Sequence, residues 1–335
     1  MTAGQPRRLG VLAADGMLLT CALIWGATFA AQKMATEHMG PLLFNGVRYL
    51  IGAAVLAPLA FVRWRSLAQG PARRSAIVGG LLAGTAMAIA SSTQQVGMHS
   101  TSVSNAGFIT GLYVILVPML GLFVGQRVGW PVWAGAALAV AGLFFLSVVP
   151  GLREEGLHIN TGDLWVLLCA CGWAFHVQVI GWAAPETDPY VISAVQFAVT
   201  GAVAFGASLA SATLLGETEW GAREVAHWDG IVQALGPLAF AAIASTCIAF
   251  TLQVVAQRSA PPAHAAILLS LESVFAAITE AVCLALGFAA LGAPFGAWKW
   301  IGCALMFAGV LLSQWKPASV RAAAARAAAA RPESA

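Results

Sequence analysis

Long apolar stretches alternate with short polar segments along the whole chain. A helix needs about 20 predominantly apolar residues to cross the hydrocarbon core of a bilayer. The apolar runs are too long for strands and lack the two-residue alternation that is typical of membrane barrels. The pattern therefore predicts ten transmembrane helices, at residues 12–33, 42–62, 76–97, 103–125, 131–149, 162–183, 190–213, 234–256, 263–287 and 296–315.

The second half of this pattern repeats the first with weak sequence similarity. Corresponding pairs include Trp25 and Trp173, Gln94 and Gln253, Tyr113 and Glu272, Gly135 and Gly302, and Gly142 and Gly309. The spacing between partners increases only across loops, as expected for a repeat with loop insertions. Each repeat holds an odd number of helices, so the second copy must cross the membrane in the opposite sense. Such inverted repeats are typical of alternating-access transporters, whose substrate site lies between the repeats near the midplane.

We therefore expect an all-α membrane protein with ten transmembrane helices, arranged as two inverted five-helix repeats. The expected segments are a cytoplasmic N-terminus at 1–11, a first repeat at 12–149, a periplasmic linker at 150–161, a second repeat at 162–315 and an Ala/Arg-rich cytoplasmic tail at 316–335.

Composition supports a membrane environment. Hydrophobic residues make up 59% of the 335, charged residues only 9%, and the mean hydropathy is +0.81. A soluble domain carries about a quarter charged residues, so lipid must be the solvent for most of this chain. All six Cys fall inside predicted helices, which leaves none in a loop for a periplasmic disulfide.

The basic residues follow the predicted topology. With the N-terminus inside, twelve of the seventeen Lys and Arg lie in cytoplasmic segments and four in outer ones. The positive-inside rule then predicts a multi-pass inner-membrane protein with both termini in the cytoplasm. The net charge of +3 gives no reason to expect a nucleic-acid partner. The Gly-rich stretches lack a Gly-Lys-Ser/Thr ending, so we expect no nucleotide cofactor and no metal.

Ionisable groups inside a membrane helix are costly and mark candidate functional sites. Glu272 falls near the middle of the predicted ninth helix, and Glu280 lies two turns further. Either could exchange a proton during transport, or could instead bond to a neighbouring helix. Arg48 could bind a substrate carboxylate, pair with an internal acid or extend to the surface. His176 can change its charge near neutral pH, or it could be a hydrogen-bonded packing residue.

Neutral polar and aromatic side chains complete the predicted site. Buried amides can join helices in lipid or line a polar path, and Trp25 and Trp173 could form apolar walls. The residues predicted to line a central cavity are Trp25, Arg48, Gln94, Asn105, Tyr113, Trp173, His176, Gln253 and Glu272, and the proton-coupling candidates are Glu272 and Glu280.

Several of these motifs resemble the drug/metabolite transporter superfamily, specifically the EamA-type proteins with two copies of a five-helix domain. The resemblance covers about residues 15–315. It rests on Trp25–Gly26 with Phe29, Arg48–Tyr49, the run from Ser104 to Tyr113 leading to Val117–Pro118, the run from Leu269 to Phe275, and the run from Ala308 to Leu312. It implies a secondary transporter that exports a small metabolite, such as an amino acid or a derivative, by alternating access.

Two other classes were weighed against transport. An intramembrane enzyme acting on a lipid-linked substrate would need clustered acids, His or metal ligands at a membrane face, and the sequence has no such cluster. A non-transporting membrane subunit would be expected to carry an output domain, but the longest soluble pieces are short. We therefore expect a small-molecule substrate and membrane lipid as the partners of this protein.

Overall fold

The computed structural model describes residues 10–67, 69–149, 160–288 and 294–315. Within these residues, nine helices are long and apolar enough to cross a membrane, and Ala297–Ser313 is a shorter apolar helix. Each predicted stretch coincides with one of them, which confirms the prediction of an all-helical membrane protein. Most of the predicted N-terminal segment and of the linker at 150–161, and the whole tail at 316–335, lie outside the described residues.

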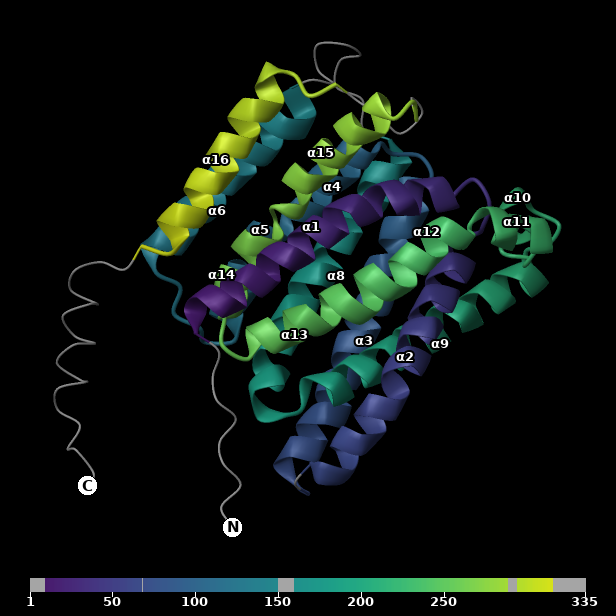
Figure 1. The fold of residues 1–335 in the computed structure, drawn as a ribbon, viewed down its shortest axis with the longest axis horizontal. Helices are drawn as coiled ribbons and strands as arrows, with labels where there is room; N and C mark the ends of the chain where they lie inside the picture. The colour runs from purple at the N-terminus through teal and green to yellow at the C-terminus, as the bar shows by residue number, and fades with distance from the viewer. Residues whose placement is uncertain (1–9, 68, 150–159, 289–293, 316–335) are drawn as a thin grey trace.

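The helices follow one another with short connections (Figure 1). The first half comprises α1 (Val11–Ala35), α2 (Pro41–Ser66), α3 (Pro71–Met98), α4 (Val103–Gly111), α5 (Tyr113–Phe123) and α6 (Trp130–Leu143), which continues as the π-helix η1 (Phe144–Val148). The second half comprises α8 (Thr161–Ala183), the 3₁₀-helix η2 (Ala184–Glu186), α9 (Pro189–Leu214), α12 (Leu235–Phe240), the π-helix η3 (Ala241–Phe250), α13 (Thr251–Gln257), α14 (Pro262–Leu269), α15 (Glu272–Ala285) and α16 (Ala297–Ser313). Two short helices, α10 (Glu219–Arg223) and α11 (Trp228–Gln233), lie between α9 and α12.

Proline begins many of these helices. It occupies the first turn of α2, α3, α6, α9 and α14. The first turn has no intrahelical partner for a backbone N–H, so proline starts a helix there without losing a hydrogen bond. The local sequence thus determines where several membrane helices begin.

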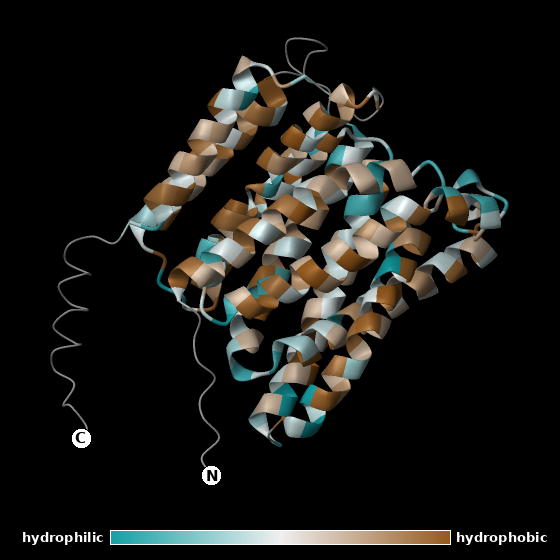
Figure 2. Ribbon diagram, viewed as in Figure 1, coloured by the Kyte–Doolittle hydropathy of each residue, from teal (hydrophilic) through white to brown (hydrophobic). Residues whose placement is uncertain are grey.

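The outer surface of the bundle is apolar along the helices. Val55, Leu167 and Ile243 lie within long helices, and they are 53%, 45% and 43% exposed. Figure 2 shows hydrophilic residues gathered mainly near the helix ends and around α10 and α11. A bilayer solvates such a surface, because its hydrocarbon core is as apolar as these side chains.

The two halves pack together with a two-fold pattern. α2 contacts its counterpart α9, and α6 contacts its counterpart α16; the second pair lies side by side at one flank of the bundle (Figure 1). α3 packs on α8, and the corresponding pair, α1 and η3–α13, also packs together. α1 also packs on α15 of the other half. The corresponding helix α8 packs on α4 and α5, which are the counterparts of α14 and α15. Exchanging the halves therefore maps these contacts onto one another, which is consistent with inverted repeats.

Two membrane helices are interrupted at corresponding positions. α4 ends at Gly111 and α5 begins at Tyr113, while α14 ends at Leu269 and α15 begins at Glu272. The sequence predicted one continuous helix in each place. Interrupted helices bring the positive ends of half-helix dipoles into the middle of a membrane protein.

The π-helix η3 distinguishes the second half from the first. It spans ten residues, and the Thr246 hydroxyl donates to the carbonyl of Ala241 at 2.9 Å. Its counterpart α3 is α-helical throughout. A π-helix places more residues in each turn and so changes which side chains face inward, and such segments often occur at functional sites.

Candidate functional site

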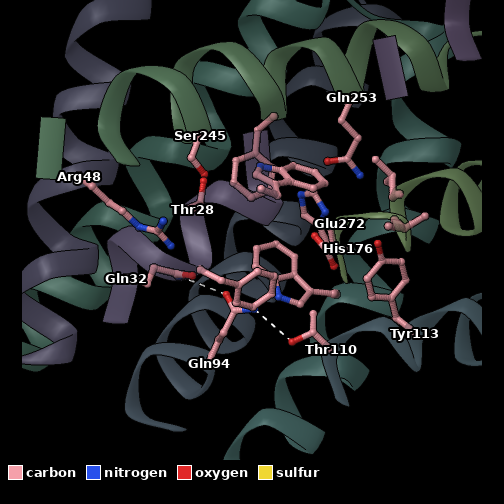
Figure 3. A pocket seen from close by; sticks show the side chains of 16 residues that line it. Thr28, Gln32, Arg48, Gln94, Thr110, Tyr113, His176, Ser245, Gln253 and Glu272 are labelled. Carbon is pink, nitrogen blue, oxygen red and sulfur yellow. Dashed lines mark hydrogen bonds between the residues drawn. The ribbon is translucent and has the colours of Figure 1, made fainter. Parts of the chain in front are cut away.

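A cavity lies at the centre of the bundle between the two halves. α1, α2, α3, α4 and α5 line it from the first half, and α8, η3, α13, α14 and α15 line it from the second. The lining residues are Trp25, Thr28, Phe29, Gln32, Arg48, Gln94, Thr110, Tyr113, Trp173, His176, Val177, Ser245, Phe250, Gln253, Leu269 and Glu272 (Figure 3). Both repeats therefore contribute to one shared cavity, the usual location of the substrate site in inverted-repeat transporters.

Eight of the nine residues predicted for a central cavity line this one. The exception is Asn105, which lies in the first turn of α4, where its backbone N–H donates to the Ser102 hydroxyl at 3.1 Å. Glu280 also lies outside the cavity. The Lys299 ammonium donates to the Glu280 carboxylate at 3.1 Å, and the Ser104 hydroxyl donates to the same oxygen. The predicted part of Glu280 in proton coupling stays a prediction.

The helix interruptions place Tyr113 and Glu272 on the cavity wall. Each is the first residue of its half-helix, and the side chains are neighbours, 3% and 5% exposed (Figure 3). The Tyr113 hydroxyl and the Glu272 carboxylate contact each other, and within the described part of the chain neither the hydroxyl nor Glu272 Oε1 makes a well-aligned hydrogen bond. Glu272 is thus placed to bind a proton or a cationic group.

Within the described residues, buried polar atoms that make no well-aligned hydrogen bond are concentrated on this wall. Six of them are Trp25 Nε1, Arg48 Nε, the Tyr113 hydroxyl, His176 Nδ1, Gln253 Oε1 and Glu272 Oε1. Buried polar groups in proteins are nearly always hydrogen-bonded. These six atoms belong to six different helices and include both donors and acceptors. Convergence of this kind is typical of a site for a small polar molecule.

An aromatic cluster forms the apolar part of the wall. The Phe250 ring centroid lies 4.6 Å from that of Trp25 and 5.5 Å from that of Trp173. The His176 ring meets Trp173 edge-on at 5.6 Å. Corresponding tryptophans of the two halves thus meet on one phenylalanine from η3. Indole faces can hold aromatic groups or cations.

Amide side chains form a hydrogen-bonded part of the wall. Gln32 Nε2 donates to Gln94 Oε1 at 3.3 Å, and Gln94 Nε2 donates to the Thr110 hydroxyl at 3.2 Å (Figure 3). His176 Nε2 and Gln196 Oε1 lie 3.0 Å apart. These bonds join α1 to α3, α3 to α4, and α8 to α9. They fix the amides and leave Nδ1 of His176, a residue that lines the cavity, without a hydrogen bond to another described residue.

Eight lining residues were not predicted to line the cavity: Thr28, Phe29, Gln32, Thr110, Val177, Ser245, Phe250 and Leu269. A partial signal existed for Thr28, Phe29 and Gln32. These residues follow Trp25 at intervals of three, four and seven, the spacing of one helix face. No such signal existed for Ser245 and Phe250, because the π-helix changes the face that they present.

Arg48 carries a cationic group within the cavity. It is 2% exposed, and its Nη2 donates to the Tyr49 hydroxyl at 3.0 Å. Its guanidinium carbon lies 4.5 Å from the Tyr49 ring centroid and 5.5 Å from that of Phe44. The ion pairs found among the described residues do not include Arg48. A guanidinium held in this way presents donors to an anionic group.

Polar contacts join α1 to neighbouring helices near both of its ends. Near the start of α1, Asp15 Oδ1 lies 2.7 Å from His264 Nε2 of α14. Near its end, the Lys33 ammonium donates to the carbonyls of Met98 and Thr101 at 2.7 and 3.0 Å. The cavity lies between these two sets of contacts. The described residues hold no cluster of three or more His, Cys, Asp or Glu side chains suited to a metal ion.

Known proteins resemble this chain in sequence and fold. It is 29% identical over 275 residues to a transporter of Archaeoglobus fulgidus described as uncharacterized, a match covering 82% of this chain and 79% of the relative. It is 26% identical to the inner membrane transporter YedA of Escherichia coli over 165 residues, 48% of this chain and 50% of YedA. It is 28% identical to the transporter YoaV of Bacillus subtilis over 163 residues, 47% of this chain and 53% of YoaV.

A solved structure titled only as the crystal structure of a protein matches the fold with a TM-score of 0.67 and 20% identity. The match covers 95% of this chain and 99% of the solved one. At that identity the likeness supports the fold alone. The sequence model of the EamA-like transporter family matches residues 12–148 and again 160–315, which correspond to the two halves of the structure. With both halves matched, this chain belongs to the EamA-like transporter family of the drug/metabolite transporter superfamily.

Proposed function

We propose that this membrane transporter exports a small metabolite, such as an amino acid or a derivative, by alternating access through the central cavity. The observation that supports this proposal is the shared cavity, on whose wall six helices each contribute a polar atom that makes no well-aligned hydrogen bond to another described residue. A binding site at the interface of two inverted repeats can be exposed to either side when the repeats rock against each other.

The contacts at the ends of α1 suit this motion. With the N-terminus in the cytoplasm, the pair of Asp15 and His264 would close the inner end, and the Lys33 contacts would hold α1 against its own repeat at the outer end. The first set joins α1 to α14 of the other repeat, whereas Lys33 contacts Met98 and Thr101 of its own repeat. Rocking of the repeats would therefore break the pair of Asp15 and His264 and leave the Lys33 contacts intact.

Glu272 is the residue we propose for proton coupling. Its carboxylate lies at the cavity in contact with Tyr113, and Oε1 makes no well-aligned hydrogen bond among the described residues. Among the described residues, the other titratable groups near the cavity are Arg48, Tyr113, His176, Cys21 and Cys169. A substrate ammonium and a proton would compete for the same carboxylate. Competition of this kind exchanges an outgoing cationic group for an incoming proton, so the inward proton gradient would drive export.

Transport by purified protein in liposomes tests both parts of this proposal. The substrates are radiolabelled amino acids, tested first by counterflow and then under an imposed pH gradient. We expect counterflow of at least one amino acid, accelerated by the gradient in the wild type. Glu272→Gln should retain counterflow but lose its response to the gradient. Glu219→Gln is the matched control, because Glu219 is exposed on α10.

The possible outcomes separate the two parts. Absence of counterflow for every amino acid would overturn the proposed substrate class. Counterflow that still responds to the pH gradient in Glu272→Gln would overturn the coupling role of Glu272 alone. The same experiment with Glu280→Gln tests the other predicted coupling residue.

A further inference from the structure

Arg48 is a buried cation that the fold leaves without a counter-ion. Its side chain comes from the second turn of α2 and extends into the cavity toward Gln32 and Thr28 (Figure 3). Other buried acids among the described residues have partners of their own. Glu224, which contacts the start of α2, accepts from the backbone N–H groups of Leu42 and Leu43. Asp15 pairs with His264, and Glu280 pairs with Lys299. Glu272 shares the cavity with Arg48 but forms no ion pair with it.

Neutral polar side chains share the cavity wall with Arg48. Thr28 and Gln32 come from α1, Gln94 from α3 and Ser245 from η3. None of these side chains carries a negative charge. A guanidinium inside a membrane protein normally pairs with an acid, with backbone carbonyls or with water. Arg48 instead bonds to one hydroxyl, so most of its donor capacity is uncommitted.

The surroundings of Arg48 fix the orientation of its guanidinium. The Tyr49 hydroxyl accepts from Nη2, and the rings of Tyr49 and Phe44 lie within 4.5 and 5.5 Å of the guanidinium carbon. Nε, on an edge of the same plane, has no partner. Aromatic rings near the guanidinium and one anchored nitrogen reduce its freedom to rotate. A carboxylate can then accept two parallel hydrogen bonds from one edge of the guanidinium.

We propose that Arg48 is the binding site for the carboxylate of the transported substrate. This inference rests on the proposed function, since it assigns a substrate group to the same cavity. It divides the cavity by charge: the carboxylate binds at Arg48, while a cationic amine is left to Glu272 and the indoles of Trp25 and Trp173. The substrate class that matches is a small zwitterion with a free carboxylate.

Binding to the purified protein tests this assignment without requiring transport. The probes are the L-amino acids and their α-amides, which keep the side chain and the amine but lack the carboxylate. Quenching of tryptophan fluorescence can report binding, because Trp25 and Trp173 line the cavity. For the wild type we expect the amino acid to bind about tenfold or more tightly than its amide, the loss expected for a charge-assisted hydrogen bond.

Variants of Arg48 link this preference to the guanidinium. Arg48→Gln should bind an amino acid and its amide with similar affinity, while Arg48→Lys should keep part of the preference because it keeps the charge. Arg63→Gln is the matched control, since Arg63 lies exposed on the same helix. Should Arg48→Gln fail to fold, Arg48→Lys and the wild-type comparison still decide the question.

Several results would overturn the assignment. The first is a wild type for which no amino acid binds more tightly than its amide. The second is an Arg48→Gln variant that retains the full preference. A third arm adds chloride or acetate: acetate should compete with the amino acid, and competition by chloride alone would mean that the site holds an inorganic anion. Amino-acid binding without counterflow would leave the Arg48 site intact and overturn the proposed transport.

Discussion

Gly135 and Gly309 approach so closely that a Cβ atom on either would lie 2.6 Å from the carbonyl oxygen of the other. Gly142 and Gly302 have the same relationship, also at 2.6 Å. Gly135 corresponds to Gly302 in the repeat, and Gly142 corresponds to Gly309, so each contact is the two-fold image of the other. The α6–α16 pair therefore preserves the symmetry of the repeats down to individual backbone atoms.

Adding one methyl group at this contact should separate the two helices. Gly309→Ala places a Cβ against a backbone oxygen that no side-chain rotation can relieve, so we expect destabilisation of about 1–3 kcal/mol. Thermal unfolding in detergent measures the effect. Gly206→Ala is the control, because Gly206 lies in α9 with nothing within 4 Å of its added Cβ. Equal melting temperatures for the two variants would contradict the close approach.

The buried pair of Glu280 and Lys299 should behave as one unit. Lys299→Met alone leaves a buried carboxylate with only the Ser104 hydroxyl as a partner. Removing one member of a buried ion pair costs about 3–5 kcal/mol. The double variant Lys299→Met with Glu280→Leu should recover most of that loss. A double-mutant cycle by denaturant unfolding measures the coupling, and additive losses would show that the two groups act independently.

Phe250 should contribute to substrate affinity through the two tryptophans that it contacts. Phe250→Leu roughly conserves volume but removes the ring pairs with Trp25 and Trp173, each worth about 0.5–1.5 kcal/mol, together with the ring contacts to Tyr49, His176 and Phe197. We expect about tenfold weaker binding of the amino acid identified by counterflow, a loss of about 1.4 kcal/mol. Phe240→Leu is the control, since Phe240 is 37% exposed in the adjoining α12. Unchanged affinity in Phe250→Leu would separate the aromatic cluster from substrate binding.

Reporter fusions test the predicted orientation in the membrane. Alkaline phosphatase is active only outside the cytoplasm. Joined after residue 315, it should be inactive, and inserted between α10 and α11 it should be active. The asymmetry of Lys and Arg predicts this result. Activity at the C-terminal junction would mean that the termini face the periplasm, and would exchange the inner and outer roles proposed for the contacts of α1.

The sequence predicted the ten helices because hydropathy depends on composition and length alone. It also predicted which helices of the two halves correspond, because similar side chains such as Trp25 and Trp173 occur at equivalent positions. The interruptions before Tyr113 and Glu272 could not be predicted, since neither position carries a proline or a pair of glycines. They depend on packing between α4–α5 and α14–α15.

The candidate site was partly predictable for a related reason. Exposing a polar side chain to hydrocarbon is costly, so polar side chains of membrane helices face the interior of the bundle. This rule was enough to predict that Arg48 and Gln94 line the cavity. Glu280 obeys the same rule but finds Lys299, a partner from another helix that sequence spacing does not reveal. Phe250 carries no polar group, and only the π-helical geometry of η3 brings it to the cavity.

The matched interruptions give the two repeats one equivalent position each at the start of a half-helix. Tyr113 occupies it in the first repeat and Glu272 in the second. Exchanging the occupants, with Tyr113→Glu and Glu272→Tyr in one chain, keeps the atoms of the cavity nearly constant but moves the ionisable group to the mirror position. During evolution, two substitutions could therefore move the ionisable group of the cavity from one repeat to the other without a change in the helix packing.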